Sequence, residues 1–371
     1  MELWQKLLAS AFRQPIQLSL FYPNLDVAAL DEVAEVYPMC INPYYLSLAE
    51  RPDDPIGRPC IPDPAELEPT TLLPDPLAEE STSPVPCVVH RYPDRALFLV
   101  TTRCAMYCRF CTRKRKVGKD QRITEEMRRE GLDYIARTPE VRDVIVSGGD
   151  PLLLPDEVLE DILLGLRRIR HVEVIRIGTR VPCTLPHRVT RRLARMLRKY
   201  NPLFVNTHVD PPRELTAQAA VALGRLADAG IPLGNQSVLL HGVNDDPAVF
   251  LELNRRLLAC RVRPYYLYQA DLVEGTEHFR TPVETGLRVV RALRGHTSGL
   301  AVPQFVIDAP GGGGKIPLLP EDTVQRDGAR MVLRNYRDEL YVYPDETSRP
   351  EAPPLAAEPD CAGHLGLFTG C

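Results

Sequence analysis

The chain has 371 residues, of which 44% are hydrophobic and 25% are charged, and its formal net charge is -4. This length allows a large buried core in one big α/β domain or two smaller ones. A weakly acidic chain gives no reason to expect nucleic acid or an anionic membrane as a partner, so small molecules are the expected partners. No stretch approaches the roughly 18 apolar residues of a membrane span, and the first residues lack the order of a signal peptide. We therefore expect a cytoplasmic protein without a membrane partner.

Composition divides the chain into four parts. Residues 1–89 are rich in proline and acidic side chains, which predicts an N-terminal extension of helices and proline-rich loops. Residues 90–300 form the expected core. Residues 301–346 contain a glycine-rich loop and a lysine and are expected to pack on that core, and residues 347–371 form a proline-rich tail.

From Ala96 onward, short β-rich runs alternate with helical patterns. Strands are expected at 97–101, 143–147, 173–178, 203–207, 233–240 and 264–269. Helices are expected at 124–137, 155–168, 190–200, 214–229 and 247–259, and a sixth helix opens with a predicted cap at Thr281. The strand starts lie roughly 30 residues apart after the first gap, which is the length of a βαβ unit. This pattern predicts an α/β fold with a partial (β/α)6 barrel of parallel strands, to which residues 303–307 add a further strand.

Three cysteines, Cys104, Cys108 and Cys111, lie within eight residues directly after the first expected strand. Thiolates are the ligands of iron–sulfur clusters, and three of them on a four-iron cluster leave one iron open to a ligand. A structural zinc site usually needs four ligands in closely spaced pairs, and no fourth Cys or His is an obvious local partner. The spacing therefore favours a catalytic iron–sulfur cluster, with a zinc site or three unrelated buried thiols as the alternatives.

A glycine-rich run, Gly311 to Gly314, leads into Lys315. A phosphate-binding P-loop is excluded, because Ile316 stands where that motif requires Ser or Thr. A flexible segment that presents one lysine amine suits a Schiff base with an aldehyde cofactor. The alternative is a surface loop with a solvated lysine.

Acidic residues end several of the expected strands. Asp271 and Asp308 each follow an apolar β-like run, and two convergent carboxylates would suit a second ammonium group on a substrate. Either aspartate alone could be a strand-end cap. In Gly148-Gly149-Asp150 the glycines allow close backbone approach to a ligand and the carboxylate can receive an ammonium group, but the same run also makes a common turn.

The spacing Cys-x3-Cys-x2-Cys is the hallmark of the radical S-adenosylmethionine superfamily. The run Cys-Ala-Met-Tyr-Cys-Arg-Phe-Cys-Thr-Arg-Lys-Arg resembles the lysine 2,3-aminomutase family in particular. The resemblance extends from about Val89, through His90-Arg-Tyr-Pro-Asp-Arg95, to about Tyr343. One departure is Phe110, where the family usually has histidine. We expect it to alter contacts near the adenine without removing the cluster.

This resemblance implies three cofactors: a [4Fe-4S] cluster, S-adenosylmethionine (SAM) and pyridoxal 5′-phosphate (PLP). The residues that match the family's positions are Cys104, Cys108 and Cys111 for the cluster, Gly148, Gly149, Asp150, His208 and Gln236 for SAM, Lys315 for PLP, and Arg113, Asp271 and Asp308 for the substrate. Arg113 matches the position that binds the substrate carboxylate, and the two aspartates match those that bind its distal amine. Arg91 and Arg95 are candidates for the PLP phosphate, or else surface arginines.

Some members of the family also have a zinc site made by a cysteine in an Asn-Asp-Cys-Pro segment and a cysteine-rich C-terminal cluster. Here the segment reads Asn244-Asp245-Asp246-Pro247, and the tail contains only Cys361 and Cys371. We therefore expect this zinc to be absent.

The resemblance implies an isomerase that moves the 2-amino group of L-lysine to carbon 3 to give β-lysine. It also implies a reductant such as flavodoxin or ferredoxin, and a homo-oligomeric assembly. Two alternatives stay open. One is a 2,3-aminomutase for arginine or another cationic amino acid. The other is a metal-cluster regulator that binds nucleic acid through the basic run Arg113-Lys114-Arg115-Lys116, which the acidic chain as a whole disfavours.

Overall fold

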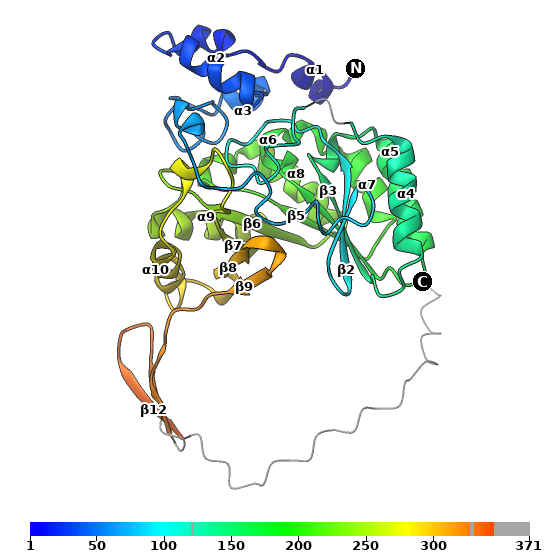
Figure 1. Ribbon diagram of the computed structural model, residues 1–371. Coiled ribbons are helices and arrows are strands. Elements are labelled where there is room, and N and C mark those ends of the chain that lie inside the picture. The colour runs from blue at the N-terminus through cyan, green and yellow to red at the C-terminus, as the bar shows by residue number, and fades with distance from the viewer. Residues whose placement is uncertain (120–121, 327–329, 345–371) are drawn as a thin grey trace. The chain divides into compact units, whose positions relative to one another are not determined.

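The computed structural model describes residues 1–119, 122–326 and 330–344. The chain forms two compact units, Met1–Pro320 and a second unit that begins at Glu321. The first unit contains every site residue predicted from the sequence, and its ribbon is shown in Figure 1. The domain boundaries expected after residues 89, 300 and 346 remain predictions, and the expected tail lies outside the described residues.

A nine-stranded sheet runs in the order β1 to β9 through the first unit. Its strands are β1 (Val88–Tyr92), β2 (Arg95–Thr101), β3 (Asp143–Gly148), β4 (Val174–Thr179), β5 (Leu203–Thr207), β6 (Leu233–Leu239), β7 (Val262–Gln269), β8 (Gln304–Ala309) and β9 (Gly314–Pro317). Strands β2 to β8 pair in parallel, and β1 and β9 pair antiparallel at the two ends. The six predicted parallel strands and the additional strand at 303–307 are confirmed. No pairing joins β1 to β9 among the described residues, so the barrel is partial, as predicted.

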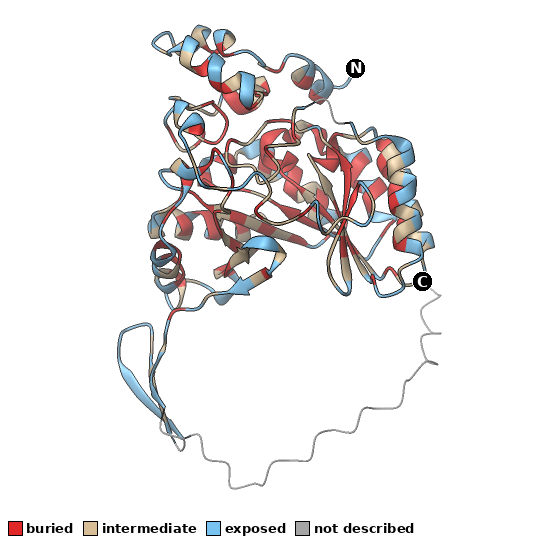
Figure 2. Ribbon diagram, in the orientation of Figure 1, coloured by how far each residue is buried: buried red, intermediate tan, exposed pale blue. Residues whose placement is uncertain are grey.

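Helices cover the parallel sheet and bury an apolar side against it, as Figures 1 and 2 show. They are α4 (Glu125–Ala136), α5 (Asp156–Arg168), the short α6 (Val181–Thr184), α7 (Arg191–Arg198), α8 (Ala217–Asp228), α9 (Pro247–Ala259) and α10 (Val283–Leu293). Thr124, Thr190 and Thr216 cap α4, α7 and α8 by accepting a hydrogen bond from a backbone N–H of the first turn. The helices predicted between the strands are therefore confirmed.

The predicted cap at Thr281 is wrong. Helix α10 begins at Val283, its N-cap residue is Pro282, and the Pro282 carbonyl accepts a hydrogen bond from the N–H of Thr285. The carbonyl of Thr281 instead accepts a hydrogen bond from the Gln269 side chain at 2.6 Å, which ties the chain before α10 to the end of β7. The side-chain hydroxyl of Thr281 is buried without a hydrogen-bond partner, so it accepts no N–H of the first turn of α10.

The N-terminal extension contains α1 (Leu3–Ala9), α2 (Val27–Val36) and α3 (Pro43–Leu46). Ile41 forms short antiparallel bridges with Phe12 on one side and Met106 on the other. An apolar cluster that includes Tyr45, Ile56 and Met106 buries this junction. The extension therefore packs directly on the loop that contains the three cysteines.

The second unit contains a three-stranded antiparallel sheet of β10 (Thr323–Arg326), β11 (Arg330–Arg334) and β12 (Leu340–Pro344). Every residue of β12 is exposed. Among the described residues of both units, no helix combines the length and apolar character that crossing a membrane requires.

Candidate active site

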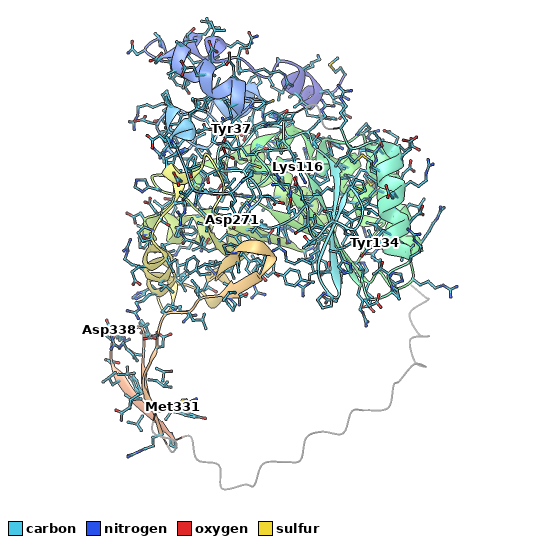
Figure 3. The ribbon with its side chains drawn as sticks, viewed as in Figure 1. Tyr37, Lys116, Tyr134, Asp271, Met331 and Asp338 are labelled. Carbon is cyan, nitrogen blue, oxygen red and sulfur yellow. The ribbon has the colours of Figure 1, made fainter. Side chains whose placement is uncertain are left out.

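One cavity of about 400 Å³ opens at the carboxyl ends of the parallel strands. Barrels of this kind place their functional groups at this end, because the loops that leave the strands project side chains there. All of the predicted site residues line it, namely Cys104, Cys108, Cys111, Arg113, Gly148, Gly149, Asp150, His208, Gln236, Asp271, Asp308 and Lys315. Arg91 and Arg95 line it as well. Figure 3 labels Asp271 among the side chains of this region.

The cysteine loop is held from outside by the N-terminal extension. The N–H of Tyr107 donates to the carbonyl of Cys40, and the N–H of Arg109 donates to the carbonyl of Pro59, both at 2.9 Å. The buried guanidinium of Arg109 also binds Glu66, with Nη2 2.6 Å from Oε2. These contacts fix the path of the loop, so the protein itself positions the thiols.

The three thiols are buried and line one cavity, and thiolates are the ligands that an iron–sulfur cluster requires. Burial raises the pKa of Cys104, Cys108 and Cys111, for Cys108 to about 11. Metal ligation requires thiolates, so a bound cluster would offset this cost. Within residues 1–119, 122–326 and 330–344, no three Cys, His, Asp or Glu side chains converge closely enough to hold one metal ion.

Gly148 and Gly149 let β3 pack against the segment that leads into the cysteine loop. A Cβ at Gly148 would lie 2.1 Å from the carbonyl oxygen of Thr101, and one at Gly149 would lie 2.3 Å from that of Arg103. Gly148 also has a φ of +141°, a backbone conformation that residues other than glycine rarely adopt. The two glycines therefore set the distance between β3 and the cysteine loop.

The carboxylate of Asp150 is engaged by neighbouring protein groups. It accepts hydrogen bonds from the Thr179 hydroxyl at 2.7 Å and from the N–H groups of Leu152, Arg180 and Val181. Burial raises the pKa of Asp150, and these hydrogen bonds oppose that rise. The side chain thus joins the ends of β3 and β4 at the cavity wall, and its contact with SAM remains a prediction.

His208 follows β5 and Gln236 lies in the middle of the neighbouring strand β6, and both line the cavity. His208 follows β5, with its Nε2 2.9 Å from Oδ2 of Asp210. Its ring centroid lies 5.5 Å from that of Phe110, so the departure from the family pattern packs directly against this histidine. Gln236 lies on β6, and the buried hydroxyl of Thr207, at the end of β5, has no hydrogen-bond partner. An unpartnered buried hydroxyl in a cavity wall fits a polar ligand.

Lys315 extends from β9 into the cavity beside Asp308 of β8. Its Nζ lies 2.9 Å from Asp308 Oδ2, and Arg91 Nη1 lies 2.8 Å from the other oxygen. The backbone N–H of Lys315 donates to the Tyr92 hydroxyl at 2.8 Å. The Nε of Arg91 is buried without a hydrogen-bond partner. An amine next to a spare guanidinium N–H fits an aldehyde cofactor that has a phosphate.

Asp271 follows β7, and its buried Oδ1 has no hydrogen-bond partner. Burial raises the pKa of Asp271 to about 7, and the charge of Asp308 also acts to raise it, while Lys315 and Arg91 lower it. A buried carboxylate with a spare oxygen in a cavity is a candidate site for a cation.

The basic run Arg113-Lys114-Arg115-Lys116 is paired with acidic side chains of the extension. Arg113 Nη2 lies 2.7 Å from Glu79, and Lys114 Nζ lies 2.6 Å from Glu66. The other two basic residues also have acidic partners, and none of the four side chains is more than 22% exposed. The run therefore offers no open basic stripe to a phosphate backbone, which removes the support for the nucleic-acid alternative.

Three residues of the cavity wall have no role in the sequence prediction. Glu79 occupies the guanidinium fork of Arg113 that the prediction assigns to the substrate carboxylate. Tyr92 holds the backbone of Lys315, and Arg180 contacts a cysteine sulfur. Tyr92 belongs to the run that carries the family resemblance, so the sequence could have indicated that it lies at the site. Glu79 lies in an acidic, proline-rich stretch without any local signal.

The segment 244–247 forms the turn before α9. The side chain of Asn244 donates to the carbonyl of Val238 on β6 and accepts from the N–H of Leu240, and Asp246 caps α9. The absence of a zinc site remains a prediction, because Cys361 and Cys371 lie outside the described residues.

Comparison with known proteins agrees with this geometry. A model described as the Radical SAM superfamily matches residues 98–253, and one described as Lysine-2,3-aminomutase matches residues 290–360. The L-lysine 2,3-aminomutase of Clostridium subterminale is 52% identical over 309 residues, which cover 82% of this chain and 74% of that protein. The L-lysine 2,3-aminomutase of Methanococcus maripaludis is 48% identical over 336 residues, covering 89% and 78%. The glutamate 2,3-aminomutase of Clostridioides difficile is 45% identical over 320 residues, covering 85% and 76%. The chain belongs to the lysine 2,3-aminomutase family of radical SAM enzymes.

Proposed function

We propose that this isomerase moves the 2-amino group of L-lysine to carbon 3 and releases β-lysine. The supporting observation is that Asp271 and Asp308 line the same cavity as Lys315. Two carboxylates attract the distal ammonium group of lysine and repel the distal carboxylate of glutamate, the substrate named for one relative. The relatives named L-lysine 2,3-aminomutase, at 52% and 48% identity, support the same substrate.

A radical SAM domain contains a [4Fe-4S] cluster and binds SAM, and together these supply a carbon radical that removes a hydrogen atom from the substrate. We propose that Cys104, Cys108 and Cys111 hold the cluster. Gly148, Gly149, Asp150, His208 and Gln236 are the proposed SAM residues. Asp150 acts by ordering two strand ends, because its own oxygens are engaged by protein groups.

PLP, when bound, supplies a conjugated ring that stabilises an adjacent unpaired electron. Lys315 is the proposed attachment point, and Arg91 and Arg95 are the proposed phosphate ligands. A guanidinium group matches phosphate oxygens through two parallel N–H donors, and the Nε of Arg91 is free to serve as one.

Asp308 has two cationic neighbours, Arg91 at 2.8 Å and Lys315 at 2.9 Å. When Lys315 bonds the aldehyde of PLP, the Oδ2 atom of Asp308 loses this partner. Its carboxylate then joins Asp271 in binding the distal ammonium of the substrate. Lysine affinity is therefore expected to be higher in the PLP-loaded protein than in the PLP-free protein.

Arg113 is the proposed partner of the substrate carboxylate. Burial opposes ionisation of Glu79, but the ion pair with Arg113 lowers the pKa of Glu79 overall. Glu79 is therefore an anion at neutral pH and competes with the substrate for the same guanidinium fork. Binding requires the substrate carboxylate to displace Glu79 or to share Arg113 with it.

Arginine, or another cationic amino acid, is the second candidate substrate, because its cationic group has a similar reach and would meet the same two carboxylates. Radical SAM enzymes need a reductant, and we propose a flavodoxin or ferredoxin in this role. A homo-oligomeric state and a cytoplasmic location complete the proposal.

The test is a substrate panel with anaerobically purified protein that contains iron, sulfide, PLP and SAM and is reduced with dithionite. Products from L-lysine, L-arginine and L-glutamate are separated by chiral chromatography. The proposal predicts that β-lysine forms with the highest kcat/KM of the three reactions. A higher value with arginine would select the second candidate, and a colourless protein that binds only zinc would overturn both.

A further inference from the structure

A buried arginine contacts one of the three cysteines. Arg180 is the first residue after β4, is 8% exposed, and its Nη1 lies 3.0 Å from Sγ of Cys108. In the part of the chain that the structure describes, no guanidinium donates in this way to the sulfur of Cys104 or Cys111. The three cysteines therefore differ in their surroundings, although their spacing in the sequence gives no sign of this.

The guanidinium of Arg180 is fixed by two buried acids. Its Nη2 lies 3.1 Å from Asp210 Oδ2 and 2.6 Å from Glu214 Oε1, and both carboxylates have 0% side-chain exposure. The hydroxyl of Tyr45, which belongs to α3 of the N-terminal extension, donates to the same oxygen of Glu214 at 2.5 Å. With both acids bound at Nη2, Nη1 remains directed at Cys108.

Aromatic rings close two further sides of the guanidinium. Its carbon lies 5.2 Å from the ring centroid of Phe110 and 5.9 Å from that of Tyr45. A planar guanidinium held between rings and carboxylates has few alternative positions. Arg180 is therefore preorganised to donate to Cys108 before any cluster binds.

An N–H donor at a cysteine sulfur changes the properties of an iron–sulfur cluster. Hydrogen bonds to the ligating sulfurs and nearby positive charge stabilise the reduced cluster, which is one electron more negative than the oxidised cluster. We propose that Arg180 is a positioning residue that donates a hydrogen bond to the cluster ligand Cys108 and raises the reduction potential of the cluster. This inference rests on the proposed function, because it requires the cluster at Cys104, Cys108 and Cys111.

The physical consequence is a cluster that accepts an electron more readily from its external reductant. Asp210 and Glu214 limit the effect, because they offset part of the positive charge while they orient the N–H. The arrangement therefore works mainly through the directed hydrogen bond, and a lysine would not reproduce it. Lysine has one side-chain nitrogen, which cannot lie beside both carboxylates and also donate to Cys108, whereas the planar guanidinium uses two nitrogens.

The test measures the midpoint potential of the cluster, followed by electron paramagnetic resonance during titration with dithionite and mediators, in protein without SAM, PLP or lysine. The variants are Arg180→Lys and Arg180→Gln. Arg180→Lys keeps a positive charge beside the two buried acids, so it protects the fold. Arg188→Lys is the matched control, because Arg188 is a fully buried arginine that binds Asp156 and the backbone carbonyls of Leu152 and Leu154 and does not line the cavity.

We expect both Arg180 variants to retain iron and sulfide at wild-type levels and to shift the midpoint to a more negative potential, with no shift in Arg188→Lys. Full cluster content with an unchanged potential in both Arg180 variants would overturn the inference. Loss of iron from both, with iron retained in Arg188→Lys, would overturn it too, because Arg180 would then serve cluster assembly. A wild-type protein that assembles no cluster would instead refute the proposed function.

Discussion

Asp308 and Lys315 are directly opposite one another on the antiparallel strands β8 and β9, and their side chains form an ion pair at 2.9 Å. Opposite residues in an antiparallel pair have Cβ atoms about 5 Å apart on the same face of the sheet. The glycine run between the two strands makes the tight connection, and the strand register then presents the lysine amine at a defined place. The lysine amine therefore lies in the cavity next to the carboxylate of Asp308.

Replacing this lysine tests its role in holding the cofactor. Lys315→Ala is expected to lose covalently held PLP and to reduce turnover below detection, since no amine remains to bond the aldehyde. Iron content should not change, because Lys315 does not touch the cysteine loop. The measurement is borohydride trapping of PLP followed by mass analysis, together with an iron assay. Lys199→Ala, which removes an exposed lysine paired with Glu160, is the control and should retain trapped PLP. Trapping at wild-type levels in Lys315→Ala would assign the attachment to another residue.

Removing the charge of Asp271 tests the ammonium site. A hydrogen bond to a charged group contributes about 1.5–3 kcal/mol, so Asp271→Asn is expected to lower kcat/KM for lysine by roughly 10- to 150-fold. The loss should appear mainly in KM, because the ammonium group is remote from the reacting carbons. Asp228→Asn, at an exposed pair with Arg261, provides the control and should leave KM unchanged. An unchanged KM in Asp271→Asn would remove this residue from the substrate site.

The raised pKa of Asp271 predicts a pH dependence of the free enzyme. Burial raises this pKa to about 7, and only the ionised carboxylate attracts an ammonium group. The value of kcat/KM reports ionisations of the free enzyme, so it should rise with pH through about 7. In Asp271→Asn this rise should disappear, while the parts of the pH profile that depend on other ionisable groups should remain. A wild-type profile that stays flat between about pH 6 and 8 would contradict the assignment, since the rise is expected around the pKa.

The same raised pKa predicts that the folded protein becomes less stable at the pH values at which Asp271 is ionised and active. The pKa of Asp271 rises from the 3.8 of an unperturbed aspartic acid to about 7 in the fold, so the folded protein binds more protons than the unfolded chain between these values. Stability therefore falls as the pH rises from about 4 to 7, by at most about 1.4 kcal/mol for each pKa unit. Asp271→Asn should remove this loss and raise the Tm of the PLP-free protein at about pH 8, above the folded pKa, as measured by scanning calorimetry. Equal Tm values for both proteins at that pH would show that ionising this carboxylate costs the fold nothing.

The strands and helices were predictable because their signals are local. The β-rich runs at β4 and β6 and the apolar residues at helical spacing along α4, α7 and α8 are read from a few adjacent residues, and the structure follows them. The cysteines and Lys315 were equally accessible, since their spacing and glycine context are local too. The cap at Thr281 failed because α10 begins one residue later than expected, at Val283, and the Thr281 hydroxyl has no hydrogen-bond partner.

The pairing partners of the site residues could not be predicted in the same way. Glu79 lies 34 residues from Arg113, and Glu214 lies 34 residues from Arg180. Such contacts depend on how the extension and the strand ends meet in three dimensions, which no local period encodes. Sequence reasoning thus identifies residues that line the cavity, and it misses the residues that hold them in place.

Gly148 offers the sharpest test of how the fold positions the cysteine loop. A Cβ at this position would lie 2.1 Å from the Thr101 carbonyl oxygen, and its φ of +141° disfavours any side chain. We expect Gly148→Ala to push the strand that leads into the cysteine loop away from β3, and therefore to lower both the Tm and the iron content after reconstitution. Gly178→Ala is the matched control, since a Cβ there would approach nothing closer than 3.5 Å and Gly178 lines the same cavity. Full iron occupancy in Gly148→Ala would show that the cysteine loop is positioned by the N-terminal extension alone. Loss of iron in Gly148→Ala with normal iron in Gly178→Ala would show that the close approach of β3 is a requirement for cluster binding.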